Sequence, residues 1–134
     1  MDSNIDKAVK NLKKGPSLAK PILDRILGKI DFTLPDDYID FITHYNGAEG
    51  VIGNSYLQLL RAEELQKENE GYQVEKYAPG HFIFGSDLGG TAYAFNKSTL
   101  IVIAFDLVGM LVADDPLQMG ENLTVFLNKL AESY

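Results

Sequence analysis

The chain has 134 residues and a mass of 14.8 kDa, the size of one ordinary domain, so we expect a single domain over residues 1–134. Hydrophobic residues make up 46% of the chain and charged residues 23%, a composition typical of folded globular proteins rather than disordered ones. The net charge is −7, and the absence of cysteine excludes disulfides, thiolate metal sites and a cysteine nucleophile.

Two short helices are predicted in the first thirty residues. The first helix ends near Gly15 and Pro16, and its apolar residues recur three and four positions apart. They are Ile5, Ala8, Val9 and Leu12. A second helix is predicted over residues 19–27, with Pro21 in its first turn, where proline is tolerated. We expect this helix to turn four apolar residues inward: Ile22, Leu23, Ile26 and Leu27.

Residues 34–47 carry the strongest local signals for a helix. Pro35 suits the first helical position, and Asp36 and Asp37 meet the positive end of the helix dipole. Asn46 and Gly47 are typical of a left-handed helix end. The apolar stripe of this helix consists of Tyr38, Phe41, Ile42 and Tyr45. A polar loop is expected over residues 45–50.

The remaining elements are mostly strands. Short apolar segments separated by turn signals predict strands over residues 56–60, 81–85, 91–96, 100–105 and 110–113. Helices are predicted over residues 62–70 and 122–133. Short links between consecutive strands require antiparallel pairing. The chain therefore predicts an α+β fold, in which helices pack on one face of an antiparallel β-sheet.

The sequence contains no complete pattern for catalysis or metal binding. Neither a nucleophile elbow nor a phosphate-binding loop is present, and His44 and His81 lack metal-ligand spacing. We therefore expect a protein that is not an enzyme and uses no cofactor or metal. The alternative is an enzyme in which one histidine shares a concave pocket with a buried aspartate or glutamate.

The stretch from Gly85 to Thr91 is unusually rich in glycine. It leads from one predicted strand into another and contains Asp87, whereas phosphate-binding loops lead into a helix N-terminus. Two interpretations stay open. The stretch is either a tight turn with positive φ at Gly89 or Gly90, or a loop whose backbone comes close to a ligand.

Charge is distributed unevenly along the chain. Residues 1–30 contain seven basic and three acidic residues, whereas residues 31–134 contain five basic and sixteen acidic ones. An acidic body repels phosphate backbones and attracts a cationic partner, so we expect a basic protein partner and no direct nucleic-acid binding. The alternative is that the acidity only keeps the protein soluble. No membrane span and no secretory signal is visible, which predicts a cytoplasmic protein without membrane association.

Two separated groups of residues also carry a family resemblance. The first comprises Leu34-Pro35, Tyr38, Phe41, Asn46-Gly47 and Glu49-Gly50, and the second comprises Gly85, Asp87, Gly89-Gly90, Tyr93, Phe95 and Asp106. In this order and spacing, over about residues 20–133, the chain resembles the SUKH superfamily of Smi/Knr cell-wall-regulator-like domains. Thr91 stands where many relatives have aspartate, and the tryptophan that many relatives carry near the N-terminal helix is absent.

The resemblance implies one α+β domain that binds other proteins. Many bacterial members resemble immunity proteins, which neutralise a cognate polymorphic or contact-dependent toxin, often a nuclease, whereas fungal members resemble regulators of cell-wall synthesis. Because the chain is one bare domain, we expect a bacterial immunity protein that binds a cognate toxin. The alternative is a regulatory or scaffold domain that recognises its partner through residues 85–93.

The expected partner-binding residues lie at loop or strand ends or on one helix face. They are Asp36, Asp40, Glu49, Asp87, Gly89, Gly90, Tyr93, Asp106 and Leu107. Leu107 and Val108 form an apolar pair in an expected turn, which favours a small hydrophobic anchor. The alternative for each residue is structural: Asp36 caps a helix, Asp87 and Asp106 bind turn amides, and Leu107 packs inward.

Overall fold

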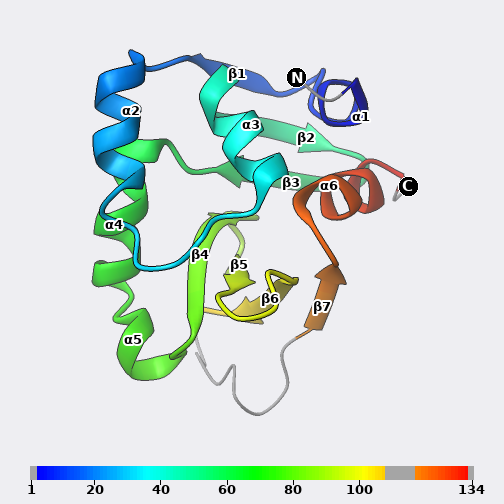
Figure 1. The fold of residues 1–134 in the computed structure, drawn as a ribbon. Coiled ribbons are helices and arrows are strands. Elements are labelled where there is room, and N and C mark those ends of the chain that lie inside the picture. Colours follow the sequence, from blue (N-terminus) through cyan, green and yellow to red (C-terminus); the bar gives the residue numbers. More distant parts are fainter. Residues whose placement is uncertain (1–2, 108–116, 133–134) are drawn as a thin grey trace.

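The structure is a computed structural model that describes residues 3–107 and 117–132, and these residues contain seven strands and six helices (Figure 1). The strands are β1 (Lys13–Pro16), β2 (Tyr45–Ile52), β3 (Ser55–Leu59), β4 (His81–Ser86), β5 (Thr91–Asn96), β6 (Val102–Asp106) and β7 (Leu117–Gly120). The helices are α1 (Ser3–Ala8), α2 (Lys20–Leu27), α3 (Asp36–His44), α4 (Ala62–Gly71), α5 (Val74–Tyr77) and α6 (Leu123–Ala131). Over these two ranges, no helix combines the length and apolar character needed to cross a membrane.

All described strands belong to one antiparallel sheet, which confirms the predicted α+β fold. Their order in the sheet is their order in the sequence. In Figure 1, β1–β3 run across the view, whereas β4 and β7 run steeply up it. The two parts are joined by a short β3–β4 pairing, in which Gln58 pairs with Ser86 and Leu59 with Gly85. A Cβ on Gly85 would lie 2.7 Å from the carbonyl oxygen of Gln58, so glycine permits this close approach.

An aromatic core fills one face of the sheet. Phe84 and Phe95 stack with their ring centroids 4.2 Å apart. The ring of Tyr38 on α3 lies 5.8 Å from Phe84 and 5.2 Å from Phe95. Phe126 on α6 meets Phe84 edge-on at 5.9 Å. Helices α3 and α6 therefore cover this face, and offset and edge-on ring contacts add to the free energy of burial.

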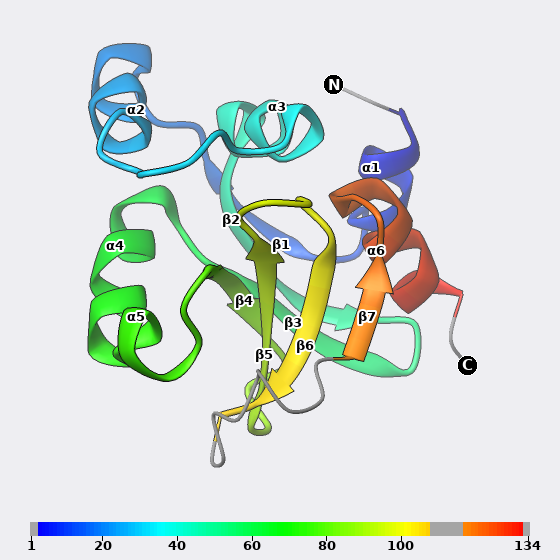
Figure 2. The ribbon, with the colours of Figure 1, turned by 60° about the horizontal axis from the view of Figure 1, so that its bottom comes forward.

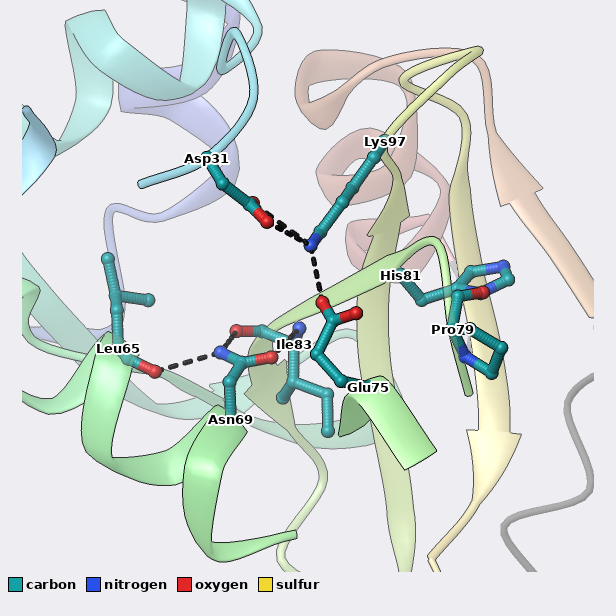
Figure 3. A network of polar contacts seen from close by, with 8 residues as sticks. All are labelled: Asp31, Leu65, Asn69, Glu75, Pro79, His81, Ile83 and Lys97. Atoms are coloured by element: carbon teal, nitrogen blue, oxygen red, sulfur yellow. Dashed lines mark hydrogen bonds and ion pairs between the residues drawn. The ribbon is translucent and has the colours of Figure 1, made fainter. Parts of the chain in front are cut away.

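Helices α4 and α5 lie beside β4 rather than over the aromatic face (Figure 2). The side-chain amide of Asn69 on α4 donates to the carbonyl of Ile83 at 2.9 Å and accepts from its N–H at 2.8 Å. The same amide nitrogen donates to the carbonyl of Leu65 at 2.8 Å (Figure 3). Because β3 pairs only with the end of β4, Asn69 takes the place of a neighbouring strand at Ile83.

The first helix is shorter than predicted and is followed by a strand that sequence analysis missed. Helix α1 ends at Ala8, and Lys13–Pro16 pair with β2 at the edge of the sheet. A Cβ on Gly15 would collide with the carbonyl oxygen of Asn46, so glycine here permits close strand contact instead of ending a helix. Pro16, which lacks an N–H group, is tolerated because β1 is an edge strand.

The predicted polar loop after the third helix is also wrong. Helix α3 ends at His44 and leads directly into β2, so Asn46 and Gly47 are strand residues rather than a helix end. The Asn46 side chain accepts from the N–H of Ala62 at 2.8 Å and donates to Glu63 at 2.7 Å. These bonds hold the start of α4 against β2 and leave Asn46 buried at 6% exposure.

Most of the other predicted elements are present in the structure. The strands over residues 56–60, 81–85, 91–96 and 100–105 and the helices over residues 19–27, 62–70 and 122–133 are confirmed, with small differences at their ends. Sequence analysis missed α5 and β7, and the strand predicted over residues 110–113 lies outside the described residues. Ile22 is 46% exposed and does not point inward as predicted, whereas Leu23 is buried.

Candidate functional site

The second face of the sheet, opposite the aromatic core, is partly exposed. A row of paired residues crosses it from β1 to β6: Lys13, Glu49, Gln58, Ser86, Ala92 and Phe105. Ala92 and Phe105 are buried at one end of the row, whereas Lys13 is exposed and Glu49 and Gln58 are half-buried at the other. The solvent-facing part of this face therefore lies over β1–β3.

Glu49 lies beside exposed apolar side chains on this face. Val51 and Tyr56 are opposite each other on β2 and β3 and are 63% and 39% exposed. The carboxylate of Glu49 accepts hydrogen bonds from the Tyr56 hydroxyl at 2.6 Å and the Gln58 amide at 3.2 Å. The bond to Glu49 raises the pKa of Tyr56. Glu49 is thus held in place within a mixed polar and apolar surface.

A groove of about 240 Å³ runs between α4 and strands β3 and β4. Leu60, Ile83 and Ala92 are its most buried lining residues. Helix α4 contributes Glu64 and Glu68, and Tyr72 follows at the end of the helix. These three residues are four positions apart, so they share one side of the helix. We call this cavity the α4 groove; Gln58, Gly85, Ser86, Leu88 and Leu107 complete its lining.

The glycine-rich stretch forms a tight turn between β4 and β5. The Asp87 carboxylate accepts from the N–H of Gly89 at 2.8 Å and from the N–H of Thr91 at 3.0 Å. Gly90 has a φ of +106°, a conformation that favours glycine, and Leu88 has a φ of +58°. The turn interpretation is therefore correct, and Asp87 binds turn amides as the structural alternative had it.

Five of the predicted site residues come together at the same end of the strands. The N–H of Leu107 donates to the carbonyl of Gly90 at 2.8 Å, which ties the β4–β5 turn to the end of β6 (Figure 2). Asp106 is exposed and pairs with Thr91. The five residues are Asp87, Gly89, Gly90, Asp106 and Leu107. Val108, the other member of the predicted apolar anchor, lies outside the described residues.

Three other predicted residues lie elsewhere. Asp36 and Asp40 are on α3, which covers the aromatic face, and a carboxylate oxygen of Asp40 lies 3.4 Å from Nδ1 of His44. Tyr93 is 5% exposed, and its ring lies 4.8 Å from that of Phe126. Burial raises the pKa of Tyr93, and the negative charge of Asp87 adds to this effect. Tyr93 is therefore a core residue, and its side chain is not accessible to a partner.

A larger cavity of about 480 Å³ lies on the other side of α4, where Lys97 joins three segments. The Lys97 ammonium is 2.9 Å from Asp31, between α2 and α3, and 2.7 Å from Glu75 on α5 (Figure 3). His81 also lines this cavity, with its Nδ1 atom 3.1 Å from the carbonyl oxygen of Pro79. Both carboxylates are engaged by Lys97, so these side chains join the segments that line this cavity.

The histidine alternative needs a buried carboxylate, and this cavity does not supply one. The side chains of Asp31 and Glu75 are 68% and 74% exposed. His44 is exposed on α3, where Nδ1 lies 2.8 Å from the carbonyl oxygen of Asp40. Among residues 3–107 and 117–132, no three histidine, cysteine, aspartate or glutamate side chains gather closely enough to hold a metal ion.

Sequence analysis missed most residues of the α4 groove. The spacing of Glu64, Glu68 and Tyr72 was visible in the sequence and indicates one helix face. What this face contacts depends on how α4 packs beside β4, which a helical pattern does not reveal. Leu88 was also missed, because an exposed leucine in a turn has no distinctive sequence signal.

Comparison with known proteins adds one finding. A family model described as the SMI1 / KNR4 family (SUKH-1) matches residues 22–129. The matched range includes α3, the whole α4 groove and the β4–β5 turn. No curated protein matches the chain.

Proposed function

The chain belongs to the SMI1/KNR4 family (SUKH-1), and from this premise we propose that it is an immunity protein that binds and neutralises a cognate bacterial toxin. The toxin is of the polymorphic or contact-dependent kind, which includes nucleases. Neutralisation occurs in the cytoplasm by occlusion, without catalysis or a cofactor: the protein covers the toxin surface that its substrate needs.

The observation that carries the proposal is the mixed surface over β2, β3 and the α4 groove. Val51, Tyr56 and Leu88 are 63%, 39% and 57% exposed. Glu49 is half-buried beside Tyr56, and Glu68 is half-buried in the α4 groove. Protein interfaces commonly combine exposed apolar and aromatic side chains with a polar rim. An isolated exposed leucine needs no explanation, but the paired Val51 and Tyr56 on a partly exposed sheet face, together with Leu88 in the lining of the α4 groove, support an interaction site.

Charge supports a basic partner. Residues 31–134 contain sixteen acidic and five basic residues, and both charged side chains that line the α4 groove are glutamates. A toxin that acts on nucleic acid needs clustered lysine and arginine at its substrate site. An acidic surface matches such a site, accelerates the encounter and blocks entry of the negatively charged substrate.

The experiment co-expresses the protein with the toxin-like product encoded beside its gene. The wild-type protein is expected to protect the cells and to form a stable complex with the toxin. Val51→Arg places a positive charge on the proposed surface, so it is expected to weaken both the complex and the protection. The matched control is Val125→Arg, because Val125 is an exposed valine on α6, outside this surface.

Two outcomes count against the proposal. One is that the wild-type protein neither protects against nor binds the neighbouring product. The other is that Val51→Arg and Val125→Arg behave alike while both proteins keep the wild-type melting temperature.

The regulatory alternative has one feature in its favour. Leu88 and Gly89 are exposed in the β4–β5 turn next to the α4 groove, so this turn is accessible to a cellular partner. A pull-down from the native host distinguishes the two functions. Recovery of envelope-synthesis proteins, with no toxin gene beside this one, would support a regulatory or scaffold domain related to cell-wall synthesis regulators.

A further inference from the structure

We propose that the α4 groove holds one cationic side chain, a lysine or an arginine, of the partner protein, with Glu68 as its counter-charge. This inference rests on the proposed function, since it names the chemistry by which the partner is held. It assigns to the groove a role that the family match does not contain.

The groove has the dimensions and floor for a long aliphatic side chain. Its volume is about 240 Å³, below the roughly 300 Å³ at which pockets for drug-sized molecules begin. Leu60, Ile83 and Ala92 make its buried floor apolar, and Leu88, which is 57% exposed, adds accessible apolar surface to the lining. Lysine and arginine lay their methylene stems along such surfaces while the charged end stays near polar groups.

The charged end would meet the α4 side of the groove. Glu64 is partly occupied, because its Oε1 atom accepts from the backbone N–H of Arg61 at 3.1 Å and from its Nε–H at 3.4 Å. Glu68 makes no side-chain hydrogen bond or ion pair with any other described residue. Within the part of the chain that the structure describes, half-buried Glu68 therefore keeps a carboxylate without a partner in this groove.

The arrangement on α4 is unfavourable for the helix alone. Glu64 and Glu68 are four residues apart, and like charges at this spacing repel one another and destabilise a helix. A cation bound between them and the apolar floor removes this repulsion. Tyr72, 39% exposed at the end of the same row, adds an aromatic side chain to the lining, and aromatic rings attract cations.

The test uses a small probe and needs no toxin. Nα-acetyl-arginine amide is titrated into the ¹⁵N-labelled full chain and followed by NMR, and Nα-acetyl-norleucine amide serves as the uncharged probe. We expect the arginine probe to shift the amide signals of Ile83, Gly85 and Ala92, and the norleucine probe to bind more weakly. Glu68→Gln is expected to weaken arginine binding by about two- to fivefold, the range for a solvent-exposed ion pair.

Glu70→Gln is the matched control, since it removes the same charge from the same helix outside the groove. It is expected to leave the binding of the arginine probe unchanged. The inference is overturned if both probes bind equally, if the shifts lie away from the groove, or if Glu68→Gln and Glu70→Gln have the same effect.

The co-expression assay separates this inference from the proposed function. If the wild-type protein and Glu68→Lys protect cells equally well, the groove is not the binding element, although the immunity function stands. If no toxin is neutralised but the arginine probe binds in a Glu68-dependent way, the immunity function is rejected and the cation-binding chemistry of the groove stands.

Discussion

Lys97 shows how one side chain joins three segments of the chain. It lies in the β5–β6 turn, contacts Asp31 and Glu75, and its ammonium is 5.8 Å from the ring centroid of Phe32. Burial by itself lowers the pKa of Lys97, but the hydrogen bonds to Glu75 and Asp31 outweigh this effect and raise it. The ammonium is therefore more stable in the folded protein than in the unfolded chain.

Lys97→Met tests this contribution through its pH dependence. We expect the substitution to lower the free energy of unfolding by about 1 kcal/mol at pH 7, since both partner carboxylates are exposed. Because the folded-state pKa is raised, the contribution is fully present below about pH 10.4, the ordinary lysine pKa, and disappears as the pH rises through the folded-state value. Urea unfolding of both proteins at pH 7 and above pH 11 measures the difference.

The control for Lys97 is Lys67→Met, on the exposed side of α4, which should have little effect at either pH. A stability difference for Lys97→Met that is unchanged above pH 11 would contradict the role assigned to the ammonium.

Tyr38 carries a buried polar group that opposes folding, in contrast to the ammonium of Lys97. Its hydroxyl is fully buried and has no hydrogen-bond partner among the described residues, and burial raises its pKa. An unpaired buried hydroxyl opposes folding, because it loses its hydrogen bonds to water. The ring of Tyr38, packed on Phe84 and Phe95, therefore carries the stabilising contribution of this residue.

Tyr38→Phe is expected to raise the free energy of unfolding by about 1 kcal/mol, because it keeps the ring contacts and removes the unpaired hydroxyl. Thermal and urea unfolding measure the effect. Tyr45→Phe is the comparison, since the Tyr45 hydroxyl donates to Asp6 at 3.2 Å and its removal should give no gain. A clear loss of stability in Tyr38→Phe would show that its hydroxyl is satisfied in the folded protein.

At the scale of elements, the edge of β4 depends on two kinds of local contact: a close approach to β3 and hydrogen bonds from a side chain of α4. Gly85 lets β3 approach at one end of the strand, and Asn69 on α4 supplies hydrogen bonds where β3 no longer pairs. The same amide nitrogen also binds the carbonyl of Leu65 within α4. Asn69 therefore fixes the middle of α4 against β4, as Asn46 fixes its start against β2, and both contacts set the position of the α4 groove.

Asn69→Ala is expected to lower the free energy of unfolding by about 2–4 kcal/mol, because it leaves the backbone N–H and carbonyl of Ile83 without partners. Asn69→Asp should not restore stability, since an ionised carboxylate accepts from the N–H but cannot donate to the carbonyls of Leu65 and Ile83. Urea unfolding measures stability, and hydrogen exchange at the Ile83 amide measures the local opening.

Gln66→Ala, an exposed change on the same helix, serves as the control for Asn69. Should Asn69→Ala unfold like this control, with the Ile83 amide still protected from exchange, the proposed edge contact would be unimportant for the fold.

At the scale of the whole molecule, the two faces of the sheet differ in what completes them. Helices α3 and α6 cover one face with aromatic contacts, whereas over β2 and β3 the other face presents Glu49, Val51 and Tyr56 to solvent. The sheet formed by the described strands has one closed and one partly open face, and the open part offers a broad surface to a partner. The net charge of −7 gives that surface a long-range attraction for basic proteins.

Association with a basic toxin is therefore expected to depend on salt. Raising the NaCl concentration from about 50 mM to about 500 mM should lower the association rate constant by about tenfold or more, because the Debye length shortens to a few ångströms. The dissociation rate should change less, since short-range apolar contacts are screened little. Stopped-flow or surface-binding kinetics measure both rates, and an association rate independent of salt would contradict electrostatic attraction.

Much of the architecture could be predicted from local pattern. The strand at Thr91–Asn96 depends on a short apolar run bounded by turn residues, and the helix that begins at Ala62 depends on helical spacing; both are properties of neighbouring residues. The edge strand at Lys13–Pro16 could not be predicted, because lysine, glycine and proline have little tendency to form strands and only pairing with β2 makes one. The helix end predicted at Asn46-Gly47 was wrong for the same reason, because strand pairing overrode the local helix-end pattern.

The sequence by itself determined the class of the fold, the acidic character of the protein and its family, since each depends on composition or on the order of short motifs. Tertiary structure alone decided which residues share a surface. In the folded protein Tyr93 is buried, Asp37 accepts a hydrogen bond from the N–H of Thr124 on α6, and Glu68 and Ile83 both line the α4 groove. The physical reason is that packing joins residues far apart in the chain, and no local spacing specifies which faces meet.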